Sequence, residues 1–160
     1  MDDPDSLPFP LDVSVNEPGW ENLFHDGVEE GVVRALRAGL EALGEPPDGE
    51  LSIALVSDQE IAELNARYRS KDGPTNVLSF PSAGPAPFQG DIVVALQTLL
   101  REAAKRRIPA RDHATHLLVH GFLHLQGYDH MEKEDAAVME ALETQALATI
   151  GIPDPYVMRT

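Results

Sequence analysis

Three of the six histidines in this 160-residue chain lie in one short motif, HGFLHLQGYDH, at residues 120–130. On a helix, His120 and His124 lie one turn apart on the same face, a spacing that lets two imidazoles bind one cation. Gly127 is placed to end this helix with a left-handed cap and to turn the chain back, which brings His130 toward the other two rings. We therefore predict a metal site whose ligands are His120, His124 and His130.

The available ligands limit which metal this site can hold. The chain has no cysteine, so nitrogen and oxygen atoms must bind the ion. Three neutral histidines without an obvious fourth ligand leave one coordination position open, as in catalytic zinc sites, where a bound water reaches a pKa of about 7. The prediction is one Zn²⁺ per chain, with another divalent transition metal as the alternative.

Two further residues near the motif are candidates for a supporting role. His116 lies on the same helical stripe but about 12 Å from His124 along the helix axis, at about 1.5 Å per residue, so we expect it to support the site rather than to bind the ion. Asp129 is the second candidate for such support. Together with Glu132 it could instead complete the shell around the ion, which would favour a purely structural metal.

The motif also bears on which bond is cut. Its spacing equals that of metzincin metalloproteases, in which a glutamate follows the first histidine and acts as general base. Gly121 stands at that position, so peptide hydrolysis would lack its main proton acceptor. Phosphodiester cleavage depends as much on charge neutralisation as on proton transfer. The residues therefore favour phosphodiester hydrolysis over proteolysis.

Cations for a phosphate-bearing substrate are concentrated in one stretch of the chain. The segment REAAKRRIPAR, residues 101–111, holds five of the 12 basic residues. Arg106 and Arg107 within it are candidates for substrate binding. The alternative is that this segment is an ordinary solvated helix face.

Hydrophobic periodicity and capping residues predict the elements that must position these side chains. Strands are expected at 10–16, 51–57, 77–80 and 91–96, and helices at 23–42, 58–69, 97–107, 113–126 and 132–150. Asp112 is the expected N-cap of the helix that carries the histidines. The order of elements predicts an α+β fold, in which a small mixed sheet of about four strands packs with about five helices.

Length and composition favour one soluble domain over residues 1–160, with a loosely ordered acidic segment at 1–10. The acidic, proline-containing start is unlike a signal peptide, and no apolar run reaches membrane-spanning length. With the lack of cysteine, this predicts a cytoplasmic protein. The net charge of −15 argues against tight unaided binding to a polyanion, so a partner could deliver the substrate.

Three segments taken together resemble the YbeY family of metal-dependent, single-strand-specific endoribonucleases. They are HGFLHLQGYDH, LNARYRSKDGPTNVLSFP and GDIVVAL, and the likeness extends over roughly residues 51–156. The resemblance implies that the three histidines of the motif bind zinc, and that Arg69 contacts the RNA or the reacting phosphate. An always-charged, planar guanidinium suits a phosphate, although a surface salt bridge is the alternative role for Arg69. Lys71 is a weaker candidate for substrate binding.

The resemblance also implies a fold and a biological role. It implies an α+β fold related to the zincins, with a zincin-like metal helix, in a cytoplasmic enzyme that processes small-subunit ribosomal RNA and takes part in ribosome quality control. Single-stranded RNA and the ribosome or its proteins are the implied partners, and neither DNA nor a membrane is expected. A ribosome assembly factor whose metal only stabilises the fold is the alternative. For the reaction itself, attack by an activated water and attack by the RNA's own 2′-hydroxyl both remain open.

Overall fold

The computed structural model describes residues 7–82, 88–128 and 132–157. Within them, the strands are β1 (Leu11–Val15), β2 (Glu50–Val56), β3 (Val77–Pro81) and β4 (Phe88–Ala95). The helices are the 3₁₀-helix η1 (Pro18–Asn22) and the α-helices α1 (Val28–Leu43), α2 (Asp58–Arg69), α3 (Leu96–Arg106), α4 (Ala110–Leu125) and α5 (Lys133–Ala148).

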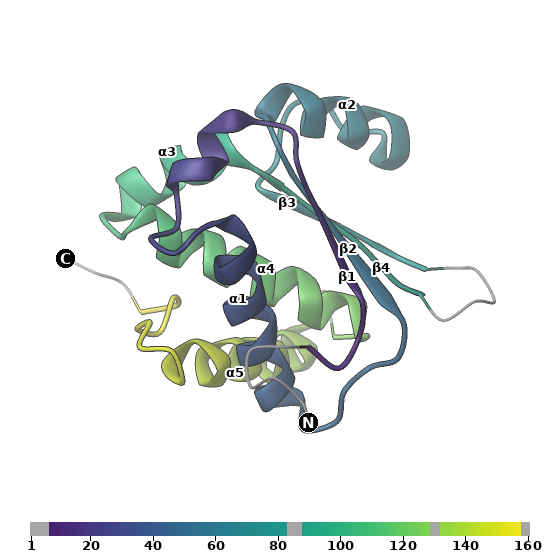
Figure 1. Ribbon diagram of the computed structural model, residues 1–160, viewed down its shortest axis with the longest axis vertical. Helices are drawn as coiled ribbons and strands as arrows, with labels where there is room; N and C mark the ends of the chain where they lie inside the picture. The colour runs from purple at the N-terminus through teal and green to yellow at the C-terminus, as the bar shows by residue number, and fades with distance from the viewer. Residues whose placement is uncertain (1–6, 83–87, 129–131, 158–160) are drawn as a thin grey trace.

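The four strands form one mixed sheet in the order β1-β2-β4-β3 (Figure 1). β1, β2 and β4 run parallel, and β3 pairs antiparallel with β4 at the edge of the sheet. The predicted α+β architecture, with a small mixed sheet of four strands and five α-helices in the described part of the chain, is confirmed.

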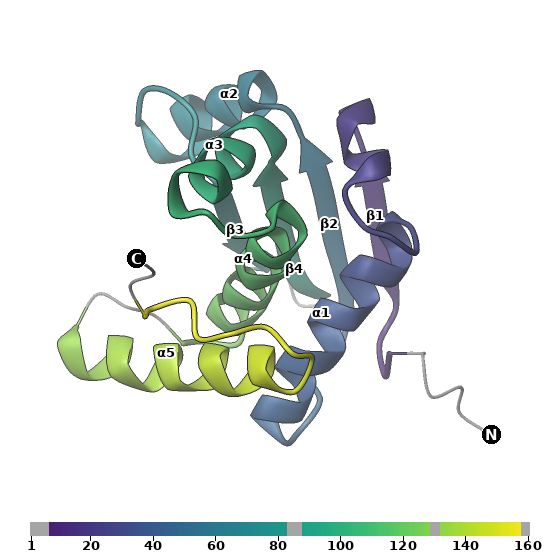
Figure 2. The same ribbon diagram turned by 90° about the vertical axis from the view of Figure 1, so that its left-hand side faces the viewer.

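The sheet separates two hydrophobic clusters of unequal size. The larger cluster contains Leu51, Ile53 and Leu55 of β2 together with apolar residues of α1, α4 and α5. The smaller cluster contains Val56 and, from α2, Ile61. Since successive residues of a strand point to opposite faces, β2 contributes to both clusters. Figure 1 accordingly shows α1, α4 and α5 on one side of the sheet and α2 on the other, and Figure 2 shows α4 lying across the strands.

Helix α4, which carries the first part of the histidine motif, lies in the middle of the larger layer. It packs against β3 and β4 on one side and against α1, α3 and α5 on others. Leu118, Val119, Phe122 and Leu123 of this helix are completely buried. Because a close-packed core leaves a helix little room to shift, the polar side chains of α4 are held in fixed positions.

Two helices begin three or more residues away from the predicted position. The helix expected from residue 23 begins at Val28, because Pro18–Asn22 form a separate 3₁₀-helix and Gly27 has a φ of 102°. Helix α4 begins at Ala110, so the prediction of Asp112 as its N-cap is wrong. Pro109 occupies the cap position, and its carbonyl accepts the backbone N–H of Asp112 at 3.1 Å, which places Asp112 inside the first turn.

The structure describes residues 7–10 of the segment that was expected to be loosely ordered. Phe9 in this part is only 6% exposed, and its ring stacks on Phe122 of α4 with the centroids 6.1 Å apart. The packed part of the chain therefore begins before β1.

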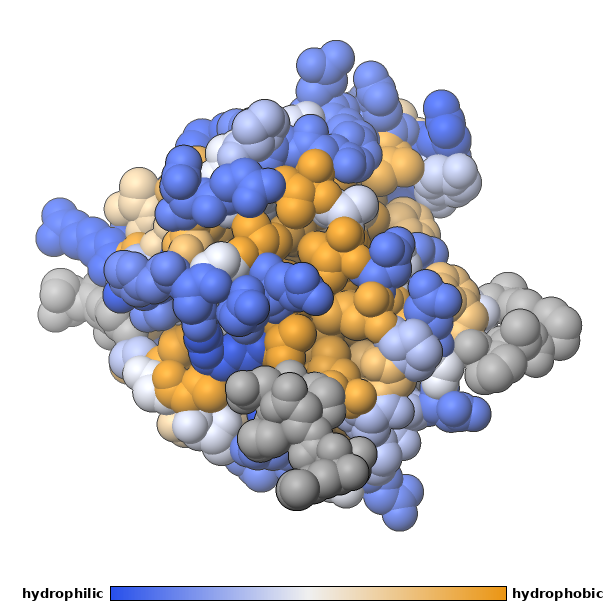
Figure 3. Space-filling view, in the orientation of Figure 1, coloured by the Kyte–Doolittle hydropathy of each residue, from blue (hydrophilic) through white to orange (hydrophobic). Residues whose placement is uncertain are grey.

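Apolar side chains reach the surface on the face that carries α1 and β1 (Figure 3). β1 is an edge strand, and its Leu11, Val13 and Val15 are only partly buried against the larger cluster. Among the helices of the described residues, we find none with the length and apolar character needed to span a membrane.

Candidate metal centre

Helix α4 places three histidines along one face, as their spacing predicts. The ring centroids of His116 and His120 are 6.4 Å apart, and those of His120 and His124 are 6.5 Å apart. The rings of His120 and His124 are parallel to within 2°, and both side chains are half-buried. The two predicted ligands on the helix therefore lie side by side in the same orientation.

Each of these rings forms a hydrogen bond through its Nδ1 atom. Nδ1 of His120 lies 2.5 Å from Oε1 of Glu143, and Nδ1 of His124 lies 3.0 Å from the carbonyl oxygen of Tyr128. Since each partner is an acceptor, Nδ1 carries the proton of the neutral ring and Nε2 keeps its lone pair. Histidines that bind metals are usually oriented in this way, with the second nitrogen donating to a carboxylate or carbonyl. His120 and His124 therefore fit a zinc ion bound through Nε2.

The end of α4 explains how the chain turns after the second histidine. Gly127 has a φ of 100°, and its N–H donates to the carbonyl of His124 at 3.1 Å. The N–H of Tyr128 donates to the carbonyl of Leu123 at 3.2 Å. These two bonds form a Schellman cap, which requires a positive φ at the glycine and supports the predicted turn at this position.

The remaining part of the predicted metal shell cannot be placed. His130, the third predicted ligand, and Asp129, a predicted supporting residue, lie outside the described residues. Among residues 7–82, 88–128 and 132–157, no three histidine or acidic side chains are grouped as a metal shell. The described geometry therefore covers two of the three predicted ligands.

Glu143 is a central residue of this region that the sequence reasoning missed. Its side chain comes from α5 and is completely buried. Burial raises its pKa, but hydrogen bonds with His116, His120 and Tyr156 outweigh burial and hold the pKa at about 2, so the carboxylate is ionised. A signal was present in the sequence, because Glu143 shares one helical face with the buried Met139 and Leu147.

His116 and Tyr156 complete a polar cluster around this carboxylate. Nε2 of His116 is 3.4 Å from Oε1 of Glu143 and 3.4 Å from the hydroxyl oxygen of Tyr156. The hydroxyl of Tyr156 in turn donates to Oε2 of Glu143. Burial and the adjacent carboxylate raise the pKa of Tyr156 above its ordinary value, so the phenol stays protonated. Tyr156 was not singled out from the sequence.

Arg69 connects to the histidine helix through the edge strand. It is the last residue of α2, and its Nη2 donates to the carbonyl of Ser79 in β3 at 2.8 Å. The guanidinium also lies over the ring of Phe80, 5.5 Å from the centroid. Oγ of Ser79 donates to the carbonyl of Gly121 at 3.4 Å, between the two predicted ligands. No carboxylate of the described residues forms an ion pair with Arg69, which disfavours the salt-bridge alternative.

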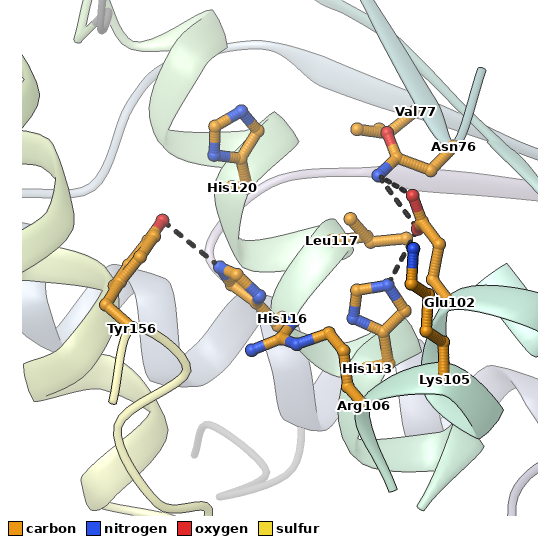
Figure 4. Close-up of a pocket in the computed structure, with 10 residues that line it drawn as sticks. All are labelled: Asn76, Val77, Glu102, Lys105, Arg106, His113, His116, Leu117, His120 and Tyr156. Carbon is orange, nitrogen blue, oxygen red and sulfur yellow. Dashed lines mark hydrogen bonds and ion pairs between the residues drawn. The ribbon is translucent and has the colours of Figure 1, made fainter. Parts of the chain in front are cut away.

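A cavity of about 500 Å³ adjoins His120 (Figure 4). Helix α3 contributes Lys105 and Arg106 to its wall, α4 contributes His116, and the C-terminal segment contributes Tyr156. Arg106 donates to the carbonyl of Pro155, which ties α3 to the C-terminal segment.

The other predicted substrate-binding cations lie elsewhere. Arg107 ends α3 with a φ of 57° and is exposed outside the cavity, and Lys71 is exposed after the end of α2. Arg106 and Arg107 were equal candidates from the sequence, but only Arg106 of the two lines the cavity. The structure adds Lys105, which the sequence reasoning did not name.

The position of Gly121 explains why a protease base has no place here. A Cβ atom on this residue would lie 2.9 Å from Cγ2 of Ile92 and 3.2 Å from Oγ of Ser79. The position that carries glutamate in metzincins is thus packed against the sheet. A longer side chain would be forced into the core instead of reaching a metal-bound substrate.

Comparisons with known proteins identify the family of the chain. The family model described as Endoribonuclease YbeY matches residues 16–151. A protein of Sinorhizobium fredii named Endoribonuclease YbeY is 54% identical over 118 residues, covering 70% of this chain and 67% of that protein. One of the same name from Agrobacterium fabrum is 46% identical over 157 residues, covering 91% and 94% of the two chains.

A solved structure supports the fold. The solution structure of a protein from Thermotoga maritima matches with a TM-score of 0.56 and 24% identity, covering 88% of this chain and 91% of that one. From the family match and the identities of the relatives, the chain belongs to the endoribonuclease YbeY family.

Proposed function

We propose that this protein is a zinc-dependent endoribonuclease that cleaves single-stranded RNA during the processing of small-subunit ribosomal RNA. Membership of the YbeY family supports an RNA-cleaving hydrolase. The observation that carries the zinc dependence is the pair of parallel rings of His120 and His124, each held at Nδ1 by an acceptor. Neutral imidazoles oriented in this way are the ligands that Zn²⁺ takes.

In this proposal His120, His124 and His130 hold the ion. When bound, it supplies Lewis-acid chemistry at the phosphoryl group and at a water molecule. The protein's part is to fix the ligand rings, which α4 does through the packing of its opposite face and through its two Nδ1 contacts. Gly121 lets α4 pack closely against the sheet. This close packing fixes the position of His120 relative to β3, the edge strand that holds Arg69.

The cations that would bind the RNA backbone come from two elements. Arg69 lies at the end of α2 and is anchored to Ser79 of β3, which in turn contacts Gly121 of the helix that carries the predicted metal ligands. Its planar guanidinium suits a phosphate group. Lys105 and Arg106 line the cavity next to His120. Eight of the 12 basic residues lie between Arg67 and Arg111, so the phosphate-binding charge is local although the whole chain is acidic. Such a local field attracts a polyanion over a short range.

The attacking group is either a water molecule or the 2′-hydroxyl of the RNA itself. Neither Arg69 nor Arg106 can remove a proton from it, since guanidinium groups stay charged. The product ends distinguish the two reactions. A 2′,3′-cyclic phosphate indicates attack by the 2′-hydroxyl, and a linear phosphate from the start of the reaction indicates attack by water.

The net charge of −15 bears on how the substrate is reached. Long-range repulsion opposes the approach of free RNA to an acidic protein. We propose that the ribosome or a ribosomal protein presents the single strand, which would place the enzyme in the cytoplasm and give it a role in ribosome quality control.

The test combines metal analysis with an RNA cleavage assay on the full chain. We expect about one zinc per chain, cleavage of a single-stranded RNA, and no cleavage of the matching duplex or of single-stranded DNA. A chelator should abolish cleavage, and added zinc should restore it. Cleavage that survives complete removal of metal would overturn the zinc dependence. A zinc-loaded protein that binds ribosomal RNA but never cuts it would instead support the assembly-factor alternative.

A further inference from the structure

We propose that Glu143 and Tyr156 are positioning residues of the metal centre, so that the C-terminal segment helps to fix the orientation of the ligand His120. This inference rests on the proposed metal site. It extends that site from one helix and a turn to three parts of the chain, namely α4, α5 and the segment around Tyr156.

The first step is the geometry of the carboxylate. Each oxygen of Glu143 has its own main donor: Oε1 accepts from Nδ1 of His120 at 2.5 Å, and Oε2 accepts from the hydroxyl of Tyr156. A carboxylate held at both oxygens cannot rotate freely about its last bond. The plane of the carboxylate, and with it the direction of the His120 ring, is therefore fixed from the side opposite to Nε2.

The second step concerns the charge of Glu143. A buried carboxylate is costly unless it is paired with a cation. Within the described residues, the ion-pair partners of Glu143 are His116 and His120, and neither a lysine nor an arginine pairs with it. A divalent cation on the far nitrogen of His120 would supply the missing positive charge. This explains why an acid stands among the apolar residues of the α5 face, between Met139 and Leu147.

The third step is how the C-terminal segment holds Tyr156. The carbonyl of Pro155 accepts from Arg106, and the carboxylate of Asp154 accepts the backbone N–H of Tyr156 at 2.8 Å and the hydroxyl of Thr144 at 3.4 Å. The ring of Tyr156 meets that of His116 edge to face, with centroids 5.6 Å apart (Figure 4). Tyr156 is thus fastened to both α3 and α5, and its hydroxyl cannot swing away from Glu143 without breaking these contacts.

The test uses Glu143→Gln, which keeps the shape of the side chain and one acceptor oxygen but removes the charge. Glu134→Gln is the matched control, since Glu134 lies on the same helix and is exposed. The dissociation constant for zinc is measured by competition with a chelator. We expect Glu143→Gln to bind zinc about 10- to 100-fold more weakly than the wild type, as for other supporting residues of metal sites. The control should bind as the wild type does.

Two further measurements separate positioning from a general structural role. Denaturant unfolding of the metal-free protein should show Glu143→Gln still fully folded under the conditions of the zinc titration, although less stable than the wild type, since a neutral amide weakens the charge-assisted hydrogen bonds to His120 and Tyr156. Nitrogen-15 spectra of the metal-free histidine rings should show His120 protonated at Nδ1 in the wild type, with this population reduced in the variant. Tyr156→Phe should weaken zinc binding by about two- to tenfold, the effect of one hydrogen bond.

The outcomes distinguish this inference from the proposed function. If the wild-type protein binds no zinc, the proposed metal site fails, and the inference fails with it. If the wild type binds zinc and Glu143→Gln binds it equally well, only the inference is overturned. The same holds if the loss of zinc affinity is matched by unfolding of the metal-free variant, because Glu143 would then be a structural residue only.

Discussion

Nδ1 of His120 lies 2.5 Å from Oε1 of Glu143, although 23 positions separate the two residues in the chain. This contact joins the helix that carries the histidine motif to the helix that follows it. It gives one of the two helical histidines a charged acceptor, whereas His124 is held by a backbone carbonyl at 3.0 Å. The two predicted ligands are therefore oriented by different acceptors, and the following predictions test the arrangement around them.

Replacing His124 should remove the metal while leaving the fold in place. Since the variant His124→Ala loses a ligand nitrogen, its zinc affinity should fall by more than the roughly 10- to 100-fold typical of a lost supporting contact. RNA cleavage should be lost with it. His25→Ala is the control, because His25 is exposed and lies outside the motif. Metal content by mass spectrometry and circular dichroism check this. Full zinc content in His124→Ala would contradict the assignment.

Replacing Arg69 should affect cleavage but not metal binding. We expect Arg69→Glu to lower kcat/KM for RNA by about 100-fold, comparable to the removal of one preorganised donor to a charged transition state. Zinc content should stay unchanged, since Arg69 contacts β3 and is not a ligand. Arg67→Glu makes the same charge change on the same exposed helix end and serves as control. Equal rates for the two variants would remove Arg69 from the reaction.

The neighbours Arg106 and Arg107 provide a matched pair. Only Arg106 lines the cavity beside His120, so Arg106→Gln should raise the KM for single-stranded RNA, while Arg107→Gln should leave it near the wild-type value. Loss of one phosphate contact should also reduce the slope of log affinity against log salt by about 0.7. Zinc content is measured in parallel, because Arg106 also holds Pro155. Similar effects of both substitutions would indicate a diffuse charge effect instead.

Gly121 should tolerate no side chain. A Cβ atom at this position would lie 2.9 Å from Cγ2 of Ile92, so Gly121→Ala should lower the free energy of unfolding by about 1–3 kcal/mol, despite the helix propensity of alanine. Gly121→Glu, which restores the metzincin pattern, should be less stable still and should not cleave peptides. Urea denaturation and a peptidase assay check both variants. An alanine variant as stable as the wild type would show that α4 can move away from the sheet.

Asp58 should make stability depend on pH. Its carboxylate accepts the backbone N–H of Thr98 in the first turn of α3 at 2.8 Å and a bond from Arg101 at 2.9 Å. Burial raises the pKa of Asp58, but the bonds from Arg101 and Thr98 outweigh it, so the pKa lies below its ordinary value. A lowered pKa means that the stabilisation is present above the unfolded-state value of about 3.9 and is lost as pH falls through the folded-state value.

The matching variant is Asp58→Asn. At neutral pH it should lower the free energy of unfolding by about 1 kcal/mol, as for the loss of a helix cap. The difference from the wild type should shrink as the pH falls below about 4. Urea titrations at neutral and acidic pH measure it. A difference that stays constant with pH would show that ionisation of Asp58 does not contribute.

The sequence by itself determined the elements and the local spacing of the site. The strands β2 and β4 contain the apolar runs IALV and IVVA, and the step of four residues places His120 and His124 on one face of any helix. Gly127 marks the end of that helix because a positive φ is cheap for glycine. These features depend on interactions between residues close in the chain, so they can be read without knowing the rest of the fold.

Only the tertiary structure decided which distant residues meet at this face. Glu143 and Tyr156 lie 23 and 36 positions beyond His120, and their approach depends on how α5 and the C-terminal segment pack against α4. The packing of the core likewise placed Arg106 in the cavity and left Arg107 outside. Periodicity tells which face of a helix is buried, but not against which neighbour. The neighbour of each helix face depends on the packing of the whole chain. Each buried polar group needs a hydrogen-bond partner, and the close-packed core determines which groups come within reach.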